Sequence, residues 1–207
     1  GENSFISIYT PELEEVEYLK LEKDMLFSDF ITSSDKVYTI GTEVEATEVE
    51  NGKNYFKNIL ISISKNDGDF SIDTIKELEV NKEKQYFFND VITKGNYLYA
   101  VSAGWRNLDS LEKIYAGAIY RYDLVNATSE FYTIEEIFPS DIYDIGDDFL
   151  AISHESITID KLGFTIFNYE TLQSEFVDIS PYAISENERI VDIKRLDLNH
   201  LLLLTEN

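Results

Sequence analysis

The side chains that could carry out chemistry are of few types in this chain. It has no cysteine and two histidines, His154 and His200, and it contains no Gly-x-Ser-x-Gly sequence. Disulfides, thiolate zinc sites, iron–sulfur clusters and cysteine nucleophiles are therefore excluded. A Ser–His–Asp triad would need one of the two histidines. Because each lies in a turn or at the end of a strand-like run, we expect both to be structural.

Two short acidic turns offer oxygen ligands for a cation. They are Asn66-Asp67-Gly68-Asp69 and Gly146-Asp147-Asp148. Both contain a glycine, as calcium loops do, but neither has the further acidic residues and terminal glutamate of a twelve-residue calcium loop. A hairpin turn explains each of them. We therefore expect no cofactor, and calcium stays an option because carboxylates gathered together favour a bound cation.

One aspartate recurs at regular distances along the chain. The four copies are separated by 61, 51 and 51 residues and are Asp29, Asp90, Asp141 and Asp192. A residue that recurs once per unit usually caps a turn or accepts a hydrogen bond from a neighbouring backbone N–H. A structural role is therefore expected for these aspartates. Lining a central channel is the alternative, in which case four like charges would call for a cation.

The best candidate for a binding site is an insertion at residues 103–115. It carries the only tryptophan, Trp105, one of four arginines, Arg106, and the aromatic residue Tyr115. Aromatic and arginine side chains dominate the energetics of many interfaces, and loops on a rigid scaffold commonly carry function. We therefore expect these three residues to contact a protein or glycan. Packing of Trp105 over the edge of the fold is the alternative.

The elements that must position these residues are strands. Apolar and polar residues alternate with a period of two in Phe5–Tyr9, Ile59–Ile63, Ala118–Tyr122 and Phe164–Asn168. Turn sequences such as Asn51-Gly52 separate these runs. Alternation of this kind between turn residues is typical of β-hairpins. The sequence therefore predicts an all-β fold.

Internal repeats indicate how the strands are grouped. One strand–turn–strand unit occurs four times, at residues 29–41, 90–102, 141–153 and, with one inserted residue, 192–205. A second hairpin follows the first, as residues 119–131 and 166–176 show by their similarity. Two hairpins make four strands in about 50 residues, which is the size of a propeller blade.

The two ends of the chain hold complementary halves of this unit. Residues 1–23 correspond to a second half, and residues 184–207 correspond to a first half. We therefore expect a single domain over residues 1–207, a β-propeller of about four four-stranded blades whose N- and C-terminal halves complete one shared blade. A β-sandwich of similar hairpins, and a propeller of five or more blades with further sequence, are the alternatives.

The pattern resembles the β-propeller superfamily in the broad sense of WD40-, YVTN- and NHL-like repeats. The resemblance covers the whole chain, but the Trp-Asp and Gly-His signatures of those repeats are missing. It is therefore a resemblance of architecture and implies no activity, because propellers include both binding modules and enzymes.

Composition excludes several classes of function. With 40 acidic and 17 basic residues the net charge is −23, which opposes binding to nucleic-acid phosphates and to anionic lipid. No apolar run approaches the roughly 18–20 residues that cross a bilayer. An acidic, cysteine-free chain of this composition indicates an extracellular or cell-surface bacterial protein, with a cytoplasmic location left open.

These observations favour a non-enzymatic binding or scaffold module that recognises a protein or glycan through loops between blades. The scarcity of catalytic residue types and the aromatic–basic insertion are the reasons. A calcium-dependent hydrolase or lactonase-like propeller enzyme that uses channel carboxylates is the alternative function. A purely structural domain of a larger surface protein is a third.

Overall fold

The computed structural model describes residues 4–12, 14–44, 47–49, 53–78, 85–105, 114–134, 138–154, 161–185 and 188–206. In these residues the chain forms nineteen strands and one short 3-10 turn, Ser180–Tyr182. All strand pairings are antiparallel. The all-β prediction is therefore confirmed. No helix in the described ranges is long and apolar enough to span a bilayer.

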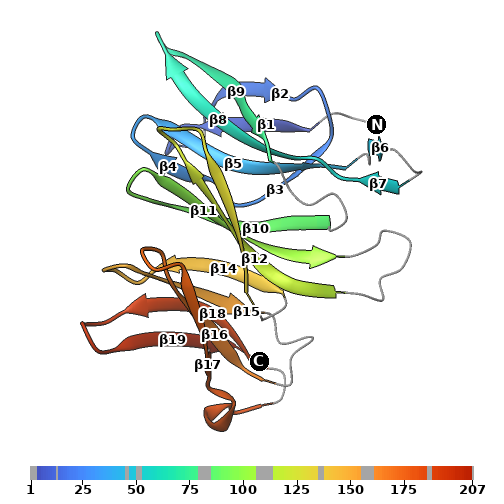
Figure 1. Ribbon diagram of the computed structural model, residues 1–207. Helices are drawn as coiled ribbons and strands as arrows, with labels where there is room; N and C mark the ends of the chain where they lie inside the picture. Colours follow the sequence, from blue (N-terminus) through green and yellow to red (C-terminus); the bar gives the residue numbers. More distant parts are fainter. Residues whose placement is uncertain are drawn as a thin grey trace.

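The strands form three complete blades between two half-blades (Figure 1). The N-terminal hairpin consists of β1 (Phe5–Tyr9) and β2 (Glu15–Lys20). The first blade consists of β3 (Met25–Phe27), β4 (Ile31–Ser33), β5 (Lys36–Glu43), β8 (Asn58–Asn66) and β9 (Asp69–Glu77). A separate hairpin, β6 (Thr47–Val49) and β7 (Lys53–Tyr55), follows β5.

The second and third blades have four strands each, paired in chain order. The second blade consists of β10 (Gln85–Lys94), β11 (Tyr97–Trp105), β12 (Ile114–Asp123) and β13 (Ser129–Thr133). The third blade consists of β14 (Pro139–Asp144), β15 (Phe149–His154), β16 (Gly163–Asn168) and β17 (Gln173–Asp178). The C-terminal hairpin consists of β18 (Arg189–Arg195) and β19 (Leu201–Glu206).

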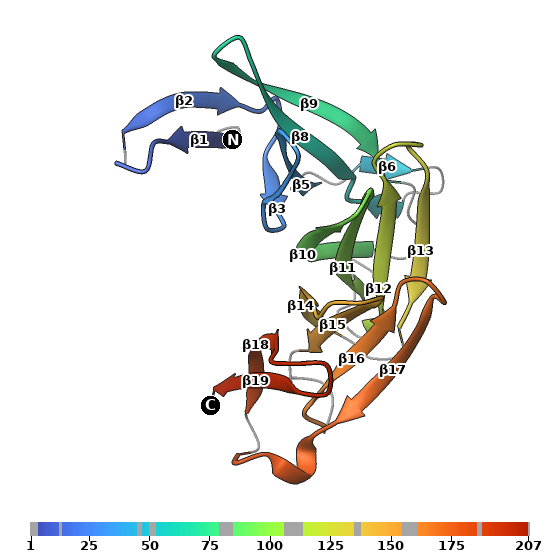
Figure 2. The same cartoon turned by 90° about the vertical axis from the view of Figure 1, so that its left-hand side faces the viewer.

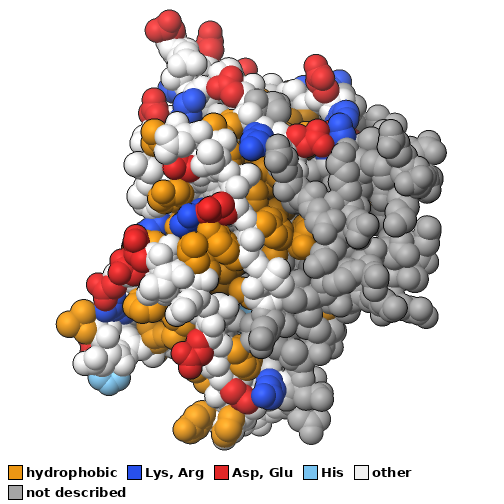
Figure 3. All heavy atoms as spheres, in the orientation of Figure 1, with side chains coloured by type: hydrophobic (Ala, Val, Ile, Leu, Met, Phe, Trp, Pro, Cys, Tyr) orange, Lys and Arg blue, Asp and Glu red, His pale blue; other side chains and the backbone are white. Residues whose placement is uncertain are grey.

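The blades stand side by side in a curved row. Figure 2 shows the first strands β3, β10, β14 and β18 on the concave side and the last strands β9, β13 and β17 on the convex side. Figure 3 views the convex side, where charged and apolar side chains are interspersed. The strand order of each blade and its inner-to-outer arrangement are propeller-like, in agreement with the repeats.

The row does not close into a ring. Within the described residues β1 pairs only with β2, and β19 pairs only with β18. The two hairpins lie at opposite ends of the arc (Figure 2). The four-bladed ring and its shared blade are therefore not confirmed. The physical reason is the curvature, because the turn between successive blades is too small for the ends to meet.

The core lies between successive blades rather than within one sheet. In β11 the consecutive residues Leu98, Tyr99, Ala100 and Val101 are all fully buried. Successive side chains of a strand point to opposite faces. Leu98 and Ala100 accordingly pack with the first blade, and Tyr99 and Val101 pack with the third. Strands buried on both faces read as near-continuous apolar runs, as this segment does.

The inner strands share an irregularity at equivalent places. The ladder of β10 shifts between Phe88 and Asp90, that of β14 between Pro139 and Ile142, and that of β18 between Ile190 and Asp192. In the first blade the inner strand is interrupted between β3 and β4. A β-bulge re-aims the side chains beside it and occurs often next to active sites. The bulges lie beside the recurring aspartates, and the segments that carry them line a cavity.

Candidate functional site

A cavity of about 580 Å³ lies at the N-terminal ends of the inner strands. Three complete blades and the C-terminal hairpin all contribute to it. Its lining residues are Leu26, Phe27, Thr42, Phe87, Phe88, Asn89, Ser140, Asp141, His154, Arg189, Ile190 and Val191. Because the bulged segments of β10, β14 and β18 all line it, the same repeat feature builds this cavity in successive blades.

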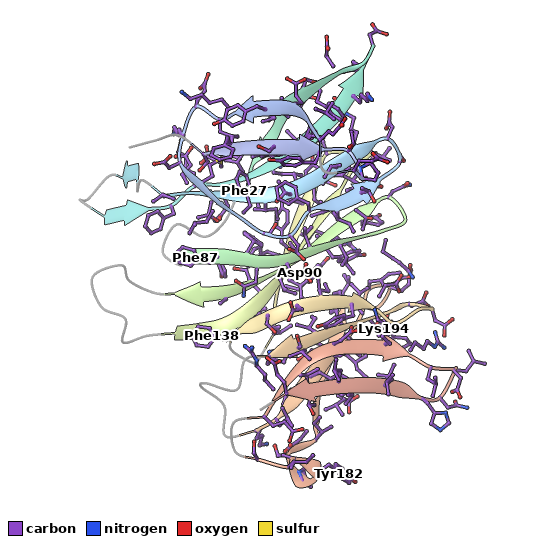
Figure 4. The ribbon with its side chains drawn as sticks, turned by 180° about the vertical axis from the view of Figure 1, so that it is seen from behind. Phe27, Phe87, Asp90, Phe138, Tyr182 and Lys194 are labelled. Atoms are coloured by element: carbon purple, nitrogen blue, oxygen red, sulfur yellow. The ribbon has the colours of Figure 1, made fainter. Side chains whose placement is uncertain are left out.

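One part of the cavity is lined by aromatic rings. Figure 4 views the concave side and labels Phe27, the last residue of β3, and Phe87, near the beginning of β10. The ring of Phe88 packs edge to face with Tyr120, 5.9 Å between centroids, which holds it in the core between the first two blades. Phe87 is half-buried at the mouth. Rings of this kind offer a surface for an apolar ligand.

Polar groups converge on the other part of the cavity. Asn89, at the bulge of β10, donates from Nδ2 to the carbonyl oxygen of Pro139 at 2.6 Å and so ties the second blade to the third. The hydroxyls of Ser140 and Ser153 lie 2.8 Å apart, and Ser153 donates to Oδ2 of Asp141 at 3.1 Å. These bonds hold the side chains in place, which is a requirement for a specific site.

His154 closes the inner wall at the end of β15. It is 2% exposed, and its Nε2 lies 2.8 Å from Oγ1 of Thr165. Its ring also packs edge to face on Phe176, 6.0 Å between centroids. These contacts fix the position of the imidazole in the cavity wall, and its expected structural role stays a prediction. His200 lies in an exposed turn with its Nδ1 2.8 Å from Asp197.

Asp90 lies just behind the cavity and joins two blades. Its Oδ2 accepts a hydrogen bond from the N–H of Ile142 in the next blade at 2.8 Å, and its Oδ1 accepts one from Val91 at 2.7 Å. The pKa of Asp90 is raised to about 6. Burial is the main cause and the charges of Asp29 and Asp141 add to it, whereas the two N–H donors act in the opposite direction. A bond to a neighbouring backbone N–H is the role the repeat predicted.

Arg189 lies at the edge of the cavity and belongs to an ion pair. Its Nε donates to Oε1 of Glu206 at 2.8 Å, across the C-terminal hairpin. Its side chain is 55% exposed, so the pair contributes little to stability. The guanidinium is nevertheless the positive charge that a negatively charged ligand group entering the cavity would meet.

Of the predicted binding residues, the structure places Trp105 and Tyr115 by their backbones alone. Trp105 ends β11 and pairs with Ile114 in the ladder, and Tyr115 pairs with Gly104. The backbones of Trp105 and Tyr115 are therefore close, at the base of one hairpin. Arg106 lies outside the described residues, and the side chains of Trp105 and Tyr115 are not described. Their contact with a protein or glycan, like the extracellular location, stays a prediction.

The two acidic turns are hairpin turns. Asp67 and Gly68 have φ values of 52° and 103°, and Gly146 and Asp147 have φ values of 82° and 47°. Left-handed conformations at these positions are what tight hairpin turns require. Asp147 also pairs with Arg195 at 2.7 Å. Among the described residues, no group of three or more histidine, aspartate or glutamate side chains could hold a metal ion.

Sequence reasoning missed Asn89 and Ser140. Each is an ordinary polar residue in a strand, and nothing in its type points to a site. The available signal was position, because both directly precede a recurring aspartate, Asp90 and Asp141. His154, which sequence reasoning did consider, directly follows the aligned segment at 141–153. Residues at equivalent positions of the repeat lie at the same end of successive blades, so their position in the repeat could have indicated a shared site.

The chain matches no protein-family model and no curated protein sequence. It is similar in structure to a variant of an ACO/RPE65 chimera, at 10% identity and a TM-score of 0.54 over 98% of this chain and 50% of that chain. It is also similar to a mutant of Synechocystis apocarotenoid oxygenase, at 9% identity and a TM-score of 0.51 over 97% of this chain and 49% of that chain. The chain thus spans about half the length of these proteins, which are seven-bladed propellers.

This likeness corrects the expected function. The proteins that share the fold are named as oxygenases, so the interpretation as a non-enzymatic binding or scaffold module is contradicted. The lactonase-like alternative finds no support among them either. The expectation was wrong because it took the scarcity of catalytic side chains as evidence against catalysis. An enzyme can leave the difficult chemistry to a cofactor and use its own residues to bind and orient.

Proposed function

We propose that this chain forms part of a β-propeller enzyme and that the cavity at its inner strands binds the substrate, a long apolar molecule with one polar end. The observation that carries the proposal is the lining of the cavity, which combines aromatic rings with a few fixed polar groups drawn from several blades. Small-molecule sites are usually concave, mostly apolar and equipped with a few convergent polar groups. An apocarotenoid, the substrate class named for the similar fold, has this chemistry.

The residues divide into two roles in this proposal. Phe27 and Phe87 contact the apolar part of the ligand, and burial of apolar surface contributes about 25 cal/mol per Å² to its binding. Asn89 and Ser140, fixed by Pro139 and Ser153, offer an amide and a hydroxyl to a carbonyl or hydroxyl at its polar end. Fixing the two ends separately would set which bond of a long molecule faces the reacting groups.

An oxygenase activates oxygen with a metal ion or an organic cofactor. The residues present in the described ranges do not fit a metal centre built from three or more carboxylate or imidazole ligands. The role that we assign to this chain is therefore to bind and orient the substrate, and no oxidative step is assigned to its side chains.

The test is a titration of all-trans-retinal, a polyene aldehyde, into the 207-residue chain, followed by protein fluorescence and by the absorption of the polyene. Saturable binding is expected. Phe87→Ala should weaken the affinity by about tenfold, because about 1–2 kcal/mol of ring contact is removed. The matched control is Phe70→Ala at the tip of the β8–β9 hairpin, where the ring lies 5.1 Å from Nζ of Lys65 and outside the cavity. Equal affinities of the two variants, or no saturable binding, would contradict the proposal.

A further inference from the structure

The two ends of the arc carry half-blades of opposite kinds. The C-terminal hairpin aligns with the first two strands of each complete blade and packs on β15 of the third blade. The N-terminal hairpin packs on the outer part of the first blade, where β2 contacts β9. One end therefore holds strands one and two of a blade, and the other end holds strands three and four.

The strand edges at the two ends match. Within the described residues β19, with six residues, has β18 as its only strand partner, and β1, with five residues, has only β2. In each complete blade the second strand pairs antiparallel with the third. An open strand edge is a template for pairing with another strand. The open edge of β19, the second strand of its half-blade, therefore matches β1, which is the third strand of the other half-blade.

The outward faces of both hairpins are apolar. On the C-terminal hairpin Leu201 and Leu203 pack against the third blade, whereas Leu202 and Leu204 point away and are 58% and 59% exposed. On the N-terminal hairpin Ile6 packs against the first blade. The rings of Phe5 and Tyr18 stack 4.8 Å apart on its other face, 54% and 50% exposed.

Apolar side chains are also exposed on the surfaces that border the opening of the arc. Phe30 follows β3 in the first blade, is 47% exposed, and has its ring 5.8 Å from that of Phe27. Tyr182 and Ile184, on the segment that joins β17 to β18, are 83% and 85% exposed. Exposed apolar area of this extent at both ends is typical of surfaces that are covered in the assembled protein.

We infer that a second copy of this chain covers these surfaces, with β19 of each copy pairing with β1 of the other. Two shared four-stranded blades then join two sets of three complete blades into a closed ring of eight. In each shared blade Leu202 and Leu204 face Phe30 of the other copy, and Phe5 packs toward the third blade. Rings of four to eight blades are within the range of propellers.

A second copy is the occupant that fits the size of the opening. The chain superimposes on about half of a seven-bladed protein, so one copy accounts for about half of a closed ring. A second copy supplies three complete blades and both missing half-blades. A two-fold axis through the centre of the ring, parallel to the ring axis, relates the two copies and makes the two junctions identical. Two-fold symmetry is the commonest symmetry of soluble oligomers. The second copy also forms the far wall facing the cavity.

The net charge of the chain predicts how the association of two copies depends on salt. Each copy carries a net charge of −23, so the two copies repel each other at long range. Salt screens that repulsion, and the apolar contacts of the junctions do not depend on it. Association should therefore become stronger as the ionic strength rises, which is the opposite of an association held by ion pairs.

The test is the molar mass of the 207-residue chain in solution by light scattering, at two salt concentrations and several protein concentrations. Twice the chain mass of 23.9 kDa is expected at high salt. Leu202→Glu should return the mass to that of one chain. The matched control Val125→Glu, at a position 68% exposed in the β12–β13 turn, should leave the dimer intact. Both leucine and valine are exposed in one copy, so neither change should prevent folding.

Closure within one copy is separated from closure between copies by cross-linking. The chain has no cysteine, so Ser7→Cys in β1 combined with Leu202→Cys in β19 gives one thiol on each edge. A short bis-maleimide should produce a covalent dimer. A single-chain mass at high salt and high protein concentration, or a cross-link confined to one chain, would overturn the inference. A single chain that still binds retinal would overturn only this inference and leave the proposed function standing.

Discussion

Asp90 should make the stability of this protein fall with rising pH in a range where most carboxylates act in the opposite direction. Its pKa is raised from 3.8 to about 6 in the folded state, chiefly by burial. Between these two values the folded protein holds a proton that the unfolded chain has released. Folding is therefore favoured at the acidic end of the range, and its free energy is lost as the pH rises from about 4 through 6.

The magnitude follows from the size of the shift. One pKa unit corresponds to about 1.4 kcal/mol, so a shift from 3.8 to about 6 sets an upper limit of about 3 kcal/mol. Asp90 is only partly buried, and solvent reduces the effect. We therefore expect a loss of about 1–3 kcal/mol in the free energy of unfolding across this range from Asp90 alone.

The assay is urea unfolding of the wild type and of Asp90→Asn at closely spaced pH values from 4 to 7. Asparagine cannot titrate and keeps one acceptor for the N–H groups of Val91 and Ile142. The stability difference between wild type and variant should therefore shrink or change sign by about 1–3 kcal/mol as the pH rises. Asp178 has a lowered pKa and so contributes stability that is lost as the pH falls. Because the wild type and Asp90→Asn both contain Asp178, its contribution cancels in the difference between them.

The control for this prediction is Asp69→Asn, at an exposed position of the β8–β9 turn. It removes a carboxylate without touching the contact between blades. A difference between wild type and Asp90→Asn that is the same at every pH would refute the reasoning, because it would mean that the side chain acts only through its hydrogen bonds.

Two further predictions concern packing. Leu98→Ala should lower the free energy of unfolding by about 2–5 kcal/mol, because Leu98 is fully buried between the first and second blades. Val125→Ala, in an exposed turn, should change it by less than about 0.5 kcal/mol in the same urea titration. Gly163→Ala should be destabilising by about 2 kcal/mol or more, since the added methyl group would collide with the backbone oxygen of Val177 and the ring of Phe176. An unchanged melting temperature for Gly163→Ala would count against the packing described for β16 and β17.

The local elements could be predicted from the sequence. The hairpins β10–β11 and β14–β15 correspond to the segments that align at residues 90–102 and 141–153, and the turn at Asp67-Gly68 joins β8 to β9. Period-two alternation and turn residues are local signals, and they determine strand pairing within a blade. The blade-to-blade bond of Asp90 could also be anticipated, because a repeated polar residue needs a repeated partner.

Closure of the ring could not be predicted in this way. Whether β19 meets β1 depends on the angle between successive blades, which the sizes of facing core side chains such as Tyr99 and Phe167 help to determine. The alternation of apolar and polar residues along a strand is the same whether the angle between successive blades is small or large. The two ends of the chain each form a two-stranded hairpin, and in the described residues these hairpins do not pair with each other, so the predicted shared blade is not confirmed.

The cavity could not be predicted either, because its residues are unremarkable one at a time. Asn89 belongs to the second blade, and Ser140 and His154 belong to the third. They line one cavity because the bulges recur at one end of the arc. The sequence analysis selected Trp105 and Arg106 instead, because tryptophan and arginine are rare in this chain. A search for polar residues at equivalent positions of the repeat would have found part of the cavity.

The measurement that tests the central claim most directly is hydrogen exchange, followed by mass spectrometry, of the 207-residue chain with and without saturating all-trans-retinal. If the inner-strand cavity is the binding site, exchange should slow in residues 85–94, 138–144 and 188–195 and stay unchanged in the hairpin tip at residues 65–70. Unchanged exchange along all three inner strands, or slowing confined to the segment around Trp105, would show that the cavity does not bind the polyene.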